Sequence, residues 1–331
     1  MNTQNSWRSS VAVRAALIAA LATACGIGGY SAQSASLSTP KPGSSSSSGV
    51  VKPAREAAPF TTADTGSCLT WDVNADGSFA NFGQTDCSSE HRYEVASREN
   101  LAAYPSSEFG PKAPAPDVTR QAQLREELCK GPTIEYLKGQ FDPLGRYSIA
   151  PILPPPEAWA AGDRTMLCGL QVAGENGIPM LTAGSATEQD QSRTHPEGTC
   201  VLVDPARSTQ TVDCGQDHSF EVTKEINLKE HFPDTVPTVE EQDEFLHEQC
   251  LTAAHEYLGG DDALYNSTLQ LFWTSINTNS WIGGSHTVNC ALFKPNDAGN
   301  FSVLQGSAKD AFTIDGAPPP PQPTRNPLRE P

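Results

Sequence analysis

The stretches DCSSEHRYEV, residues 86–95, and DCGQDHSFEV, residues 213–222, follow one pattern, Asp-Cys-x-x-acid-His-x-aromatic-Glu-Val. We call this ten-residue motif the cassette. Each copy is preceded by Gly-x-Cys and followed by a further cysteine and then by a Trp-x-x-Gly segment that contains the last cysteine. The same landmarks occur in the same order around both copies. The chain therefore contains one domain twice, and we expect the two domains at residues 59–186 and 187–314.

Composition limits the class of protein. A chain of 331 residues has room for about two domains. The formal net charge of −17 argues against binding to nucleic acid or to anionic lipid headgroups, because both require a positively charged surface. We expect no nucleic-acid partner.

Nine cysteines indicate the redox environment. The first lies in the N-terminal apolar segment, and the other eight divide evenly, four to each copy. An even set at matching spacings behind an export signal is typical of a disulfide framework. There is no Cys-x-x-Cys and no Cys/His set with zinc-finger spacing, so disulfides are favoured over structural zinc.

Four cysteines per domain allow three pairings, and sequence alone does not decide among them. We prefer one pair within each N-terminal hairpin and one pair from the helix to the last sheet strand. The preferred pairs are Cys68–Cys87, Cys129–Cys168, Cys200–Cys214 and Cys250–Cys290. A helix-to-sheet pair closes a loop of about 40 residues and contributes roughly 3–4 kcal/mol in the chain-entropy model.

The N-terminal region has the features of an export signal. Residues 1–30 carry two arginines and then the apolar run 15–25, which is short for a membrane span of about 20 apolar residues. Residues 21–25, Leu-Ala-Thr-Ala-Cys, resemble a bacterial lipobox and predict lipidation of Cys25. A plain signal peptide and a short signal anchor are the alternatives.

Two segments have compositions typical of disorder. Residues 31–58 are rich in Ser and Pro and predict a flexible tether, and residues 315–331 predict a Pro-rich disordered tail. With the signal, the tether would place both domains outside the cytoplasm and hold them at the membrane.

The pattern within each copy predicts an α+β domain. A β-prone run precedes the cassette, and the cassette's aromatic residue and valine alternate as on a half-buried strand. In the second copy, Thr238 and Glu241 form a capping box for a helix over 240–258, which Gly259 ends. In the first copy, Asp117 can cap a helix that Gly131-Pro132 breaks or kinks.

The last part of each domain is the best-preserved part of the duplication. Residues 159–186 align without gaps on residues 281–308, and Asn176-Gly177 is a hairpin signal. Each domain is therefore expected to run strand–strand–helix–strand–strand, with an antiparallel sheet.

His91 and His218 are the strongest catalytic candidates, each followed three residues later by Glu94 or Glu221. A general base needs an orienting partner within hydrogen-bond reach. On a strand, residues three apart point to opposite faces, so we expect each His and Glu not to meet. This favours a structural role for the histidines, as hydrogen-bonding groups that fix the hairpin, and we expect no enzyme.

Two further patterns suggest ligands. Asp72, Asn74 and Asp76 match the opening of a calcium loop, but Gly83 stands where the bidentate Glu is required, and a tight turn explains the same letters. Trp159 and Trp281 could form a sugar-stacking platform, although core packing is the usual role of such residues. We expect no metal and no cofactor.

These landmarks together resemble the septum-formation family of actinobacterial envelope proteins. The resemblance covers residues 66–186 and 198–308 and rests on Gly-x-Cys, the cassette, the helical cysteine and Trp-x-x-Gly-x-(Arg/His)-x-x-x-Cys. The sequence departs from the family in lacking a clear membrane helix and in having His286 where the first copy has Arg164. The resemblance implies a role near cell division and brings no catalytic residues.

We therefore expect a membrane-tethered, extracytoplasmic binding or scaffold protein of the cell envelope, linked to septum formation. Expected partners are envelope or division-site proteins or cell-wall material, and the membrane through a lipid anchor. One alternative is an envelope hydrolase that uses His91 or His218. Another is a ligand-binding lipoprotein of uptake or sensing.

Overall fold

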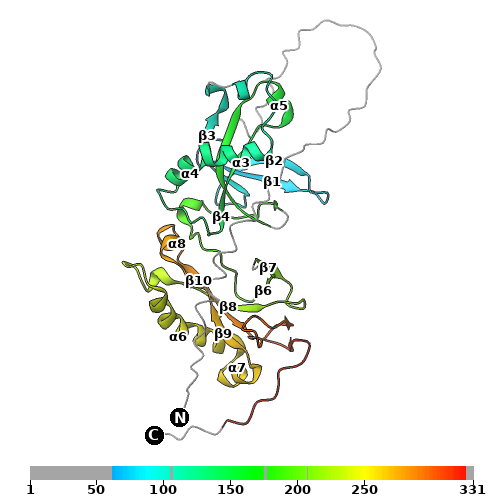
Figure 1. Cartoon of the computed structure of the whole chain (residues 1–331), viewed down its shortest axis with the longest axis vertical. Coiled ribbons are helices and arrows are strands. Elements are labelled where there is room, and N and C mark those ends of the chain that lie inside the picture. Colours follow the sequence, from blue (N-terminus) through cyan, green and yellow to red (C-terminus); the bar gives the residue numbers. More distant parts are fainter. Residues whose placement is uncertain (1–61, 105–106, 175–176, 207, 326–331) are drawn as a thin grey trace. The chain divides into compact units, whose positions relative to one another are not determined.

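The structure is a computed structural model that describes residues 62–104, 107–174, 177–206 and 208–325. The expected export signal, Cys25 and the expected tether lie outside the described residues. The described chain forms two compact units (Figure 1). The N-terminal unit contains residues 62–139 and 147–189, and the C-terminal unit contains residues 140–146 and 190–325.

The N-terminal unit is built on a five-stranded antiparallel sheet with strand order β2-β1-β3-β5-β4. Its strands are β1 (Cys68–Val73), β2 (Phe79–Thr85), β3 (Tyr93–Asn100), β4 (Tyr147–Ile152) and β5 (Thr165–Val172). The cassette of this copy leads into β3, the central strand.

The C-terminal unit repeats this topology with strand order β7-β6-β8-β10-β9. Its strands are β6 (Cys200–Val203), β7 (Thr209–Val212), β8 (Phe220–Asn227), β9 (Gln270–Trp273) and β10 (Thr287–Phe293). A small second sheet pairs β11 (Leu304–Gln305) with β12 (Thr313–Ile314).

The predicted α+β class with antiparallel sheets is confirmed in both units, and each sheet has one strand more than expected. The strands that were not expected are the edge strands β2, β4, β7 and β9, and the expected final strand is absent from both five-stranded sheets. The expected final hairpin is reduced to single bridges, Ala173–Pro179 and Pro295–Phe301.

The helices differ more than the sheets. The N-terminal unit has α3 (Val118–Leu124), the π-helical turn η4 (Arg125–Cys129), α4 (Lys130–Tyr136), α5 (Pro156–Ala160) and the 3-10 turns η2 (Leu101–Ala103), η3 (Ser107–Phe109) and η6 (Ala186–Glu188). The C-terminal unit has α6 (Val239–Leu258), α7 (Asp261–Ser267), α8 (Thr278–Ile282) and the turn η7 (Leu228–Glu230). None of the helices in the described residues combines the length and apolar composition needed to cross a membrane.

The ends of α6 are those that the sequence predicts. Thr238 Oγ1 accepts from the Glu241 N–H, and the Glu241 carboxylate accepts from the Thr238 N–H, which completes the capping box. Gly259 ends the helix in the left-handed region at φ 88°. Leu246, Cys250 and other residues at three- and four-residue spacing are buried against the sheet.

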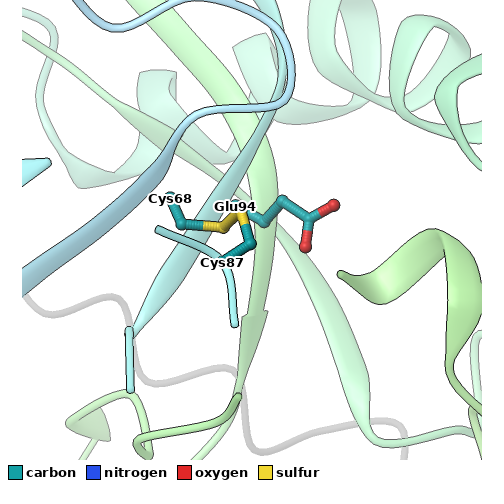
Figure 2. Close-up of side chains that lie close together, drawn as sticks. All are labelled: Cys68, Cys87 and Glu94. Atoms are coloured by element: carbon teal, nitrogen blue, oxygen red, sulfur yellow. A yellow bond between two sulfur atoms is a disulfide. The ribbon is translucent and has the colours of Figure 1, made fainter. Parts of the chain in front are cut away.

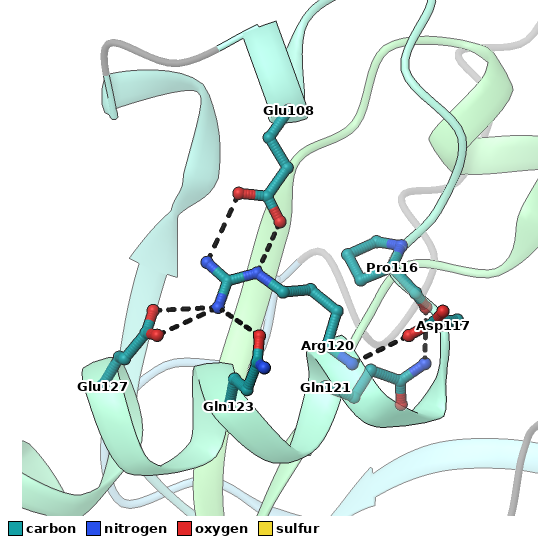
Figure 3. Close-up of polar contacts among 7 residues, drawn as sticks. All are labelled: Glu108, Pro116, Asp117, Arg120, Gln121, Gln123 and Glu127. Carbon is teal, nitrogen blue, oxygen red and sulfur yellow. Dashed lines mark hydrogen bonds and ion pairs between the residues drawn. The ribbon is translucent and has the colours of Figure 1, made fainter.

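The corresponding helix of the N-terminal unit is interrupted, as Gly131-Pro132 predicts. A π-helical turn precedes Pro132, and such a turn relieves the clash of proline with the preceding carbonyls. Asp117 caps α3 by accepting from the Arg120 N–H, and the Arg120 guanidinium bridges Glu108 and Glu127 (Figure 3). This ion-pair network joins η3 to the interrupted helix.

Four disulfides link the eight cysteines of the two units in the preferred pairs: Cys68–Cys87, Cys129–Cys168, Cys200–Cys214 and Cys250–Cys290. In each unit, one disulfide closes the N-terminal hairpin region and the other joins the helix to the central part of the sheet. Cys129 and Cys250 are buried, so the helical cysteine faces the core in both copies.

Two segments depart from the expected boundaries. Residues 140–146, which lie within the first sequence repeat, belong to the C-terminal unit. Residues 315–325, expected to be a disordered tail, instead lie along α7. There the Tyr265 hydroxyl donates to the Pro323 carbonyl, and Arg325 pairs with Asp261 and stacks on the Tyr265 ring.

Candidate functional site

Each cassette places a buried carboxylate beside a disulfide. Glu94, at the start of β3, is 2% exposed and lies next to Cys68–Cys87 (Figure 2). Its Oε1 accepts from the Tyr136 hydroxyl at 2.6 Å and from the Ser185 hydroxyl at 2.8 Å, and its Oε2 accepts from the Ala186 N–H at 2.7 Å. The carboxylate therefore joins β3, α4 and the segment that follows the last strand.

The C-terminal unit repeats this network. Glu221 is 1% exposed and accepts from the hydroxyls of Tyr257 and Ser307 and from the Ala308 N–H. Glu-Tyr-Leu and Gly-Ser-Ala, which the duplication preserves, thus supply the partners of the cassette glutamate in both copies. We call each such network the glutamate latch.

The latch leaves little acid–base chemistry available. Each carboxylate accepts three hydrogen bonds within the fold. Burial, together with the neighbouring glutamate, raises the pKa of Tyr136 and of Tyr257 well above the ordinary value for tyrosine. At neutral pH both phenols are therefore protonated donors that hold the carboxylate.

Both cassette histidines are buried and bonded to nearby backbone. The Nδ1 of His91 lies 2.9 Å from the Ser89 carbonyl, and that of His218 lies 2.9 Å from the Gln216 carbonyl. This bond fixes the ring nitrogen Nδ1 as the protonated one. The backbone of His91 also bridges to Thr182, and that of His218 bridges to Leu304. These contacts hold the cassette to the end of its own repeat.

In the second copy the side chains of His218 and Glu221 lie near each other, but the hydrogen bonds of Glu221 come from Tyr257, Ser307 and Ala308 and not from His218. Atoms of Cys200, His218 and Glu221 all lie within 4.8 Å of one another. His218 precedes β8 and forms an isolated bridge, so the alternation of a regular strand does not apply between His218 and Glu221. The Nε2 of His218 is buried without a hydrogen-bond partner.

Within the described part of the chain, two groups of side chains have the spacing of a metal site. One is Cys68, Cys87 and Glu94, and the other is Cys200, His218 and Glu221. Both cysteines of the first group and the cysteine of the second are disulfide-bonded, so their sulfurs are not the thiolates that bind metals. These groups as they stand are structural.

The residues that resemble the opening of a calcium-binding loop form a turn. Asp76 Oδ1 accepts from the N–H and the hydroxyl of Ser78, Asn74 donates to that hydroxyl, and Asp72 accepts from Asn81. The hydrogen bonds from Ser78 lower the pKa of the Asp76 carboxyl. The three candidate ligands are thus engaged in the β1–β2 connection, in agreement with the Asp-Gly turn explanation.

The two tryptophans are core residues rather than a sugar platform. Trp159 and Trp281 are 3% and 6% exposed. Arg164 stacks on Trp159 and donates to backbone carbonyls, whereas His286 at the equivalent place meets Trp281 edge-on and lies 3.4 Å from Asp190. The Arg-to-His difference between the copies therefore reflects two ways of supporting a buried indole.

The C-terminal unit contains a pocket of about 160 Å³. Its apolar walls are Phe220, Phe272, Trp273 and Ile276, and Asn289 of β10 lines it together with several hydroxyl side chains. A space of this volume can hold a small molecule.

The N-terminal unit fills the equivalent positions. In the aligned repeats, Tyr93 corresponds to Phe220 and Leu167 to Asn289. Leu167 and Tyr93 are fully buried in one cluster with Trp71. The residue of the C-terminal unit that corresponds to Trp71 is the smaller Val203. The Tyr93 hydroxyl donates to the Ala150 carbonyl at 2.7 Å. Larger side chains thus complete the packing that the C-terminal unit leaves open.

Two segments from outside the sheet complete the pocket. The strap, residues 190–195, is held by Asn289, whose Oδ1 accepts from the His195 N–H and whose Nδ2 donates to the His195 carbonyl. Buried Asp142, from residues 140–146, accepts from the hydroxyls of Ser280 and Ser285. These polar residues were not predicted, although an Asn aligned with Leu167 on a buried strand is a visible signal for them.

The sequence model that describes the septum-formation family matches residues 65–290. The chain belongs to the septum-formation family. The matched span begins one residue before the Gly-x-Cys of the first copy and ends at Cys290, so it includes all eight disulfide cysteines and both cassettes.

Two curated proteins of Mycobacterium tuberculosis, from strains CDC 1551 / Oshkosh and H37Rv, are similar to this septum-formation family member. Each is 36% identical over 270 residues, which cover 80% of the present chain and 59% of the relative. Both are called uncharacterized membrane proteins. The chain thus spans somewhat more than half the length of these relatives, and no solved structure matches it.

Proposed function

We propose that the protein is a membrane-tethered, extracytoplasmic binding or scaffold protein of the cell envelope that acts in septum formation. The observation that carries this proposal is the glutamate latch. In both copies, the acidic and histidine side chains that could have been catalytic are buried and bonded within the fold. The duplicated motif therefore serves to build two rigid units.

Several features support the location. Four disulfides suit an oxidising compartment, the N-terminal sequence has the features of an export signal, and the relatives are called membrane proteins. The membrane partner is reached through lipidated Cys25, and the protein partners are envelope or division-site proteins or cell-wall material.

Localisation in growing cells tests this role. An export-compatible fluorescent tag on the full chain is expected to concentrate at the septum, and Cys25→Ala is expected to blur or abolish that signal because it removes the lipid anchor. An even envelope signal for the unsubstituted chain would contradict the division role. An unchanged septal signal for Cys25→Ala would contradict the anchor.

The paired substitution His91→Ala with His218→Ala separates the scaffold from an envelope hydrolase. Each imidazole is buried and its Nδ1 donates to the Ser89 or Gln216 carbonyl, so we expect the variant to lose stability, which thermal unfolding of the purified protein measures. A variant that keeps its stability but loses its septal function would contradict the structural role and favour the hydrolase.

A second candidate is a ligand-binding lipoprotein of uptake or sensing. The pocket of the C-terminal unit favours it, because the same positions of the other unit are filled by Tyr93 and Leu167.

A further inference from the structure

We infer that the pocket of the C-terminal unit binds a small neutral aromatic ring with one hydrogen-bonding substituent, the chemistry of a phenol. This inference rests on the proposed binding role and names the ligand class of that unit. Free phenols and the side chain of a tyrosine in a partner polypeptide share this chemistry.

The size and the walls of the pocket select a ring. Its volume is about 160 Å³, and an apolar cavity of about 150 Å³ is known to accept benzene. Phe220 and Phe272 contribute neighbouring rings, with centroids 5.3 Å apart, and Ile276 contributes an aliphatic wall. The Trp273 Nε1–H is bonded to Asp243 outside the pocket, which fixes the indole as a wall. Aromatic walls at such spacings favour stacked or edge-on contact with a further ring.

The polar groups select a neutral ligand with a hydroxyl. Asp142 and Arg193 place one charge of each sign in the lining. The Asp142 carboxylate already accepts from Ser280, Ser285 and the Leu144 N–H. The remaining polar lining includes the hydroxyls of Ser275 and Thr287, which can both donate and accept. A cation would lose its hydration beside a carboxylate that is already saturated with donors, and an anion would lie between that carboxylate and the apolar walls, while Arg193 donates to the Gly145 carbonyl.

The duplication supplies the internal control. Leu167 occupies the N-terminal position that Asn289 occupies in the C-terminal unit, and it is fully buried. Asn289 does more than leave space, because its amide holds the strap that forms one side of the pocket. The change from leucine to asparagine between the copies therefore helps to open the site, together with the smaller Phe220 and Val203, and also builds one of its walls.

The test is isothermal titration calorimetry of p-cresol into the purified full chain, with saturation-transfer NMR to detect contact. A ligand of about eight non-hydrogen atoms is expected to bind with a dissociation constant on the order of 0.1–1 mM. Asn289→Leu and Ser275→Leu, which fill the pocket from different walls, are each expected to raise that constant at least about tenfold. The exposed Asn279→Leu is the matched control and should bind as the original chain does.

The outcomes are distinct. Saturable binding that both filling variants abolish supports the site, and tighter binding of a tyrosine-containing pentapeptide than of p-cresol identifies a polypeptide as the source of the ring. Binding of benzoate as tight as that of p-cresol would overturn the neutral class. Absence of p-cresol binding, or binding that survives Ser275→Leu in a folded variant, would overturn the site. Neither result would alter septal localisation, which tests the envelope role separately.

Discussion

In the C-terminal unit a single 20-residue helix, α6, carries the disulfide cysteine, whereas the N-terminal unit uses α3, a π-helical turn and α4 for the same purpose. The sheets of the two units have the same strand order, and their glutamate latches use the same residue types. The filling of the sheet face differs, with Tyr93 and Leu167 in one unit and a pocket in the other.

This comparison separates what the fold requires from what it tolerates. Disulfides and the latch join elements far apart in the sequence, so losing either would release a strand or a helix. Helix continuity and side-chain size on one sheet face can change without altering those links. The copies therefore diverge where a change does not break the links that hold each unit together.

Removal of the helix-to-sheet disulfide should distinguish the two helices. Cys129→Ala with Cys168→Ala, and Cys250→Ala with Cys290→Ala, are each expected to cost about 4 kcal/mol. The first pair should lower the melting temperature of its unit further, because a π-helical turn breaks the regular α-helical hydrogen bonding that α6 keeps over 20 residues. Calorimetry of the full chain checks this, and equal shifts would contradict the dependence on helix continuity.

Leu167→Asn makes the filled sheet face resemble the open one. We expect a loss of about 3 kcal/mol, because a fully buried leucine is replaced by an amide among apolar neighbours. Urea denaturation measures the change, with the exposed Leu181→Asn as the control. A change below about 1 kcal/mol, within the range of ordinary surface substitutions, would indicate that the N-terminal unit can accommodate the amide as the C-terminal unit does.

Glu94→Gln and Glu221→Gln should weaken the two units by similar amounts. Each replaces an acceptor oxygen by an NH₂ group, which leaves either the hydroxyls or the Ala N–H without a partner, and we expect about 2 kcal/mol. Exposed Glu90→Gln, within the same cassette, is the control. Strongly unequal losses in urea denaturation would show that the latch contributes differently in the two copies.

The smallest expected effect is a pH dependence confined to the C-terminal unit. Burial and then Arg193 lower the pKa of His195 below its ordinary value of 6.5, against a smaller opposing effect of Glu225. Below pH 6.5 the imidazole therefore binds a proton more readily in the unfolded state than in the folded state. The stability that the neutral imidazole contributes is complete above pH 6.5 and is lost as the pH falls to the lower pKa of the folded state. His195→Gln should flatten this slope and exposed His247→Gln should not; an unchanged slope in His195→Gln would contradict the assignment.

Much of the fold could be predicted because its signals are local. The capping box at Thr238, the helix end at Gly259 and the π-helical turn before Pro132 involve neighbouring backbone groups. The duplication also showed which residues the two copies share. It did not reveal the edge strands β2, β4, β7 and β9, since an edge strand is defined by backbone pairing with a single neighbouring strand.

The candidate sites were predicted only in part. The cassette identified Glu94, but its partners Tyr136 and Ser185 lie 42 and 91 residues away, and no spacing rule connects them. The pocket requires Asp142, which belongs to the other sequence repeat, and no periodicity assigns a loop to a distant sheet. Tertiary packing decided these contacts.

The assignment of residues 140–146 to the C-terminal unit has a consequence for proteolysis. Each of the four disulfides joins cysteines of one unit, so among the residues that the structure describes only the backbone links the two covalently. A protease that nicks the chain at residues 187–189 would nevertheless leave Asp142 bonded to Ser280 and Ser285. The two fragments would then co-elute in native gel filtration and part only in denaturant.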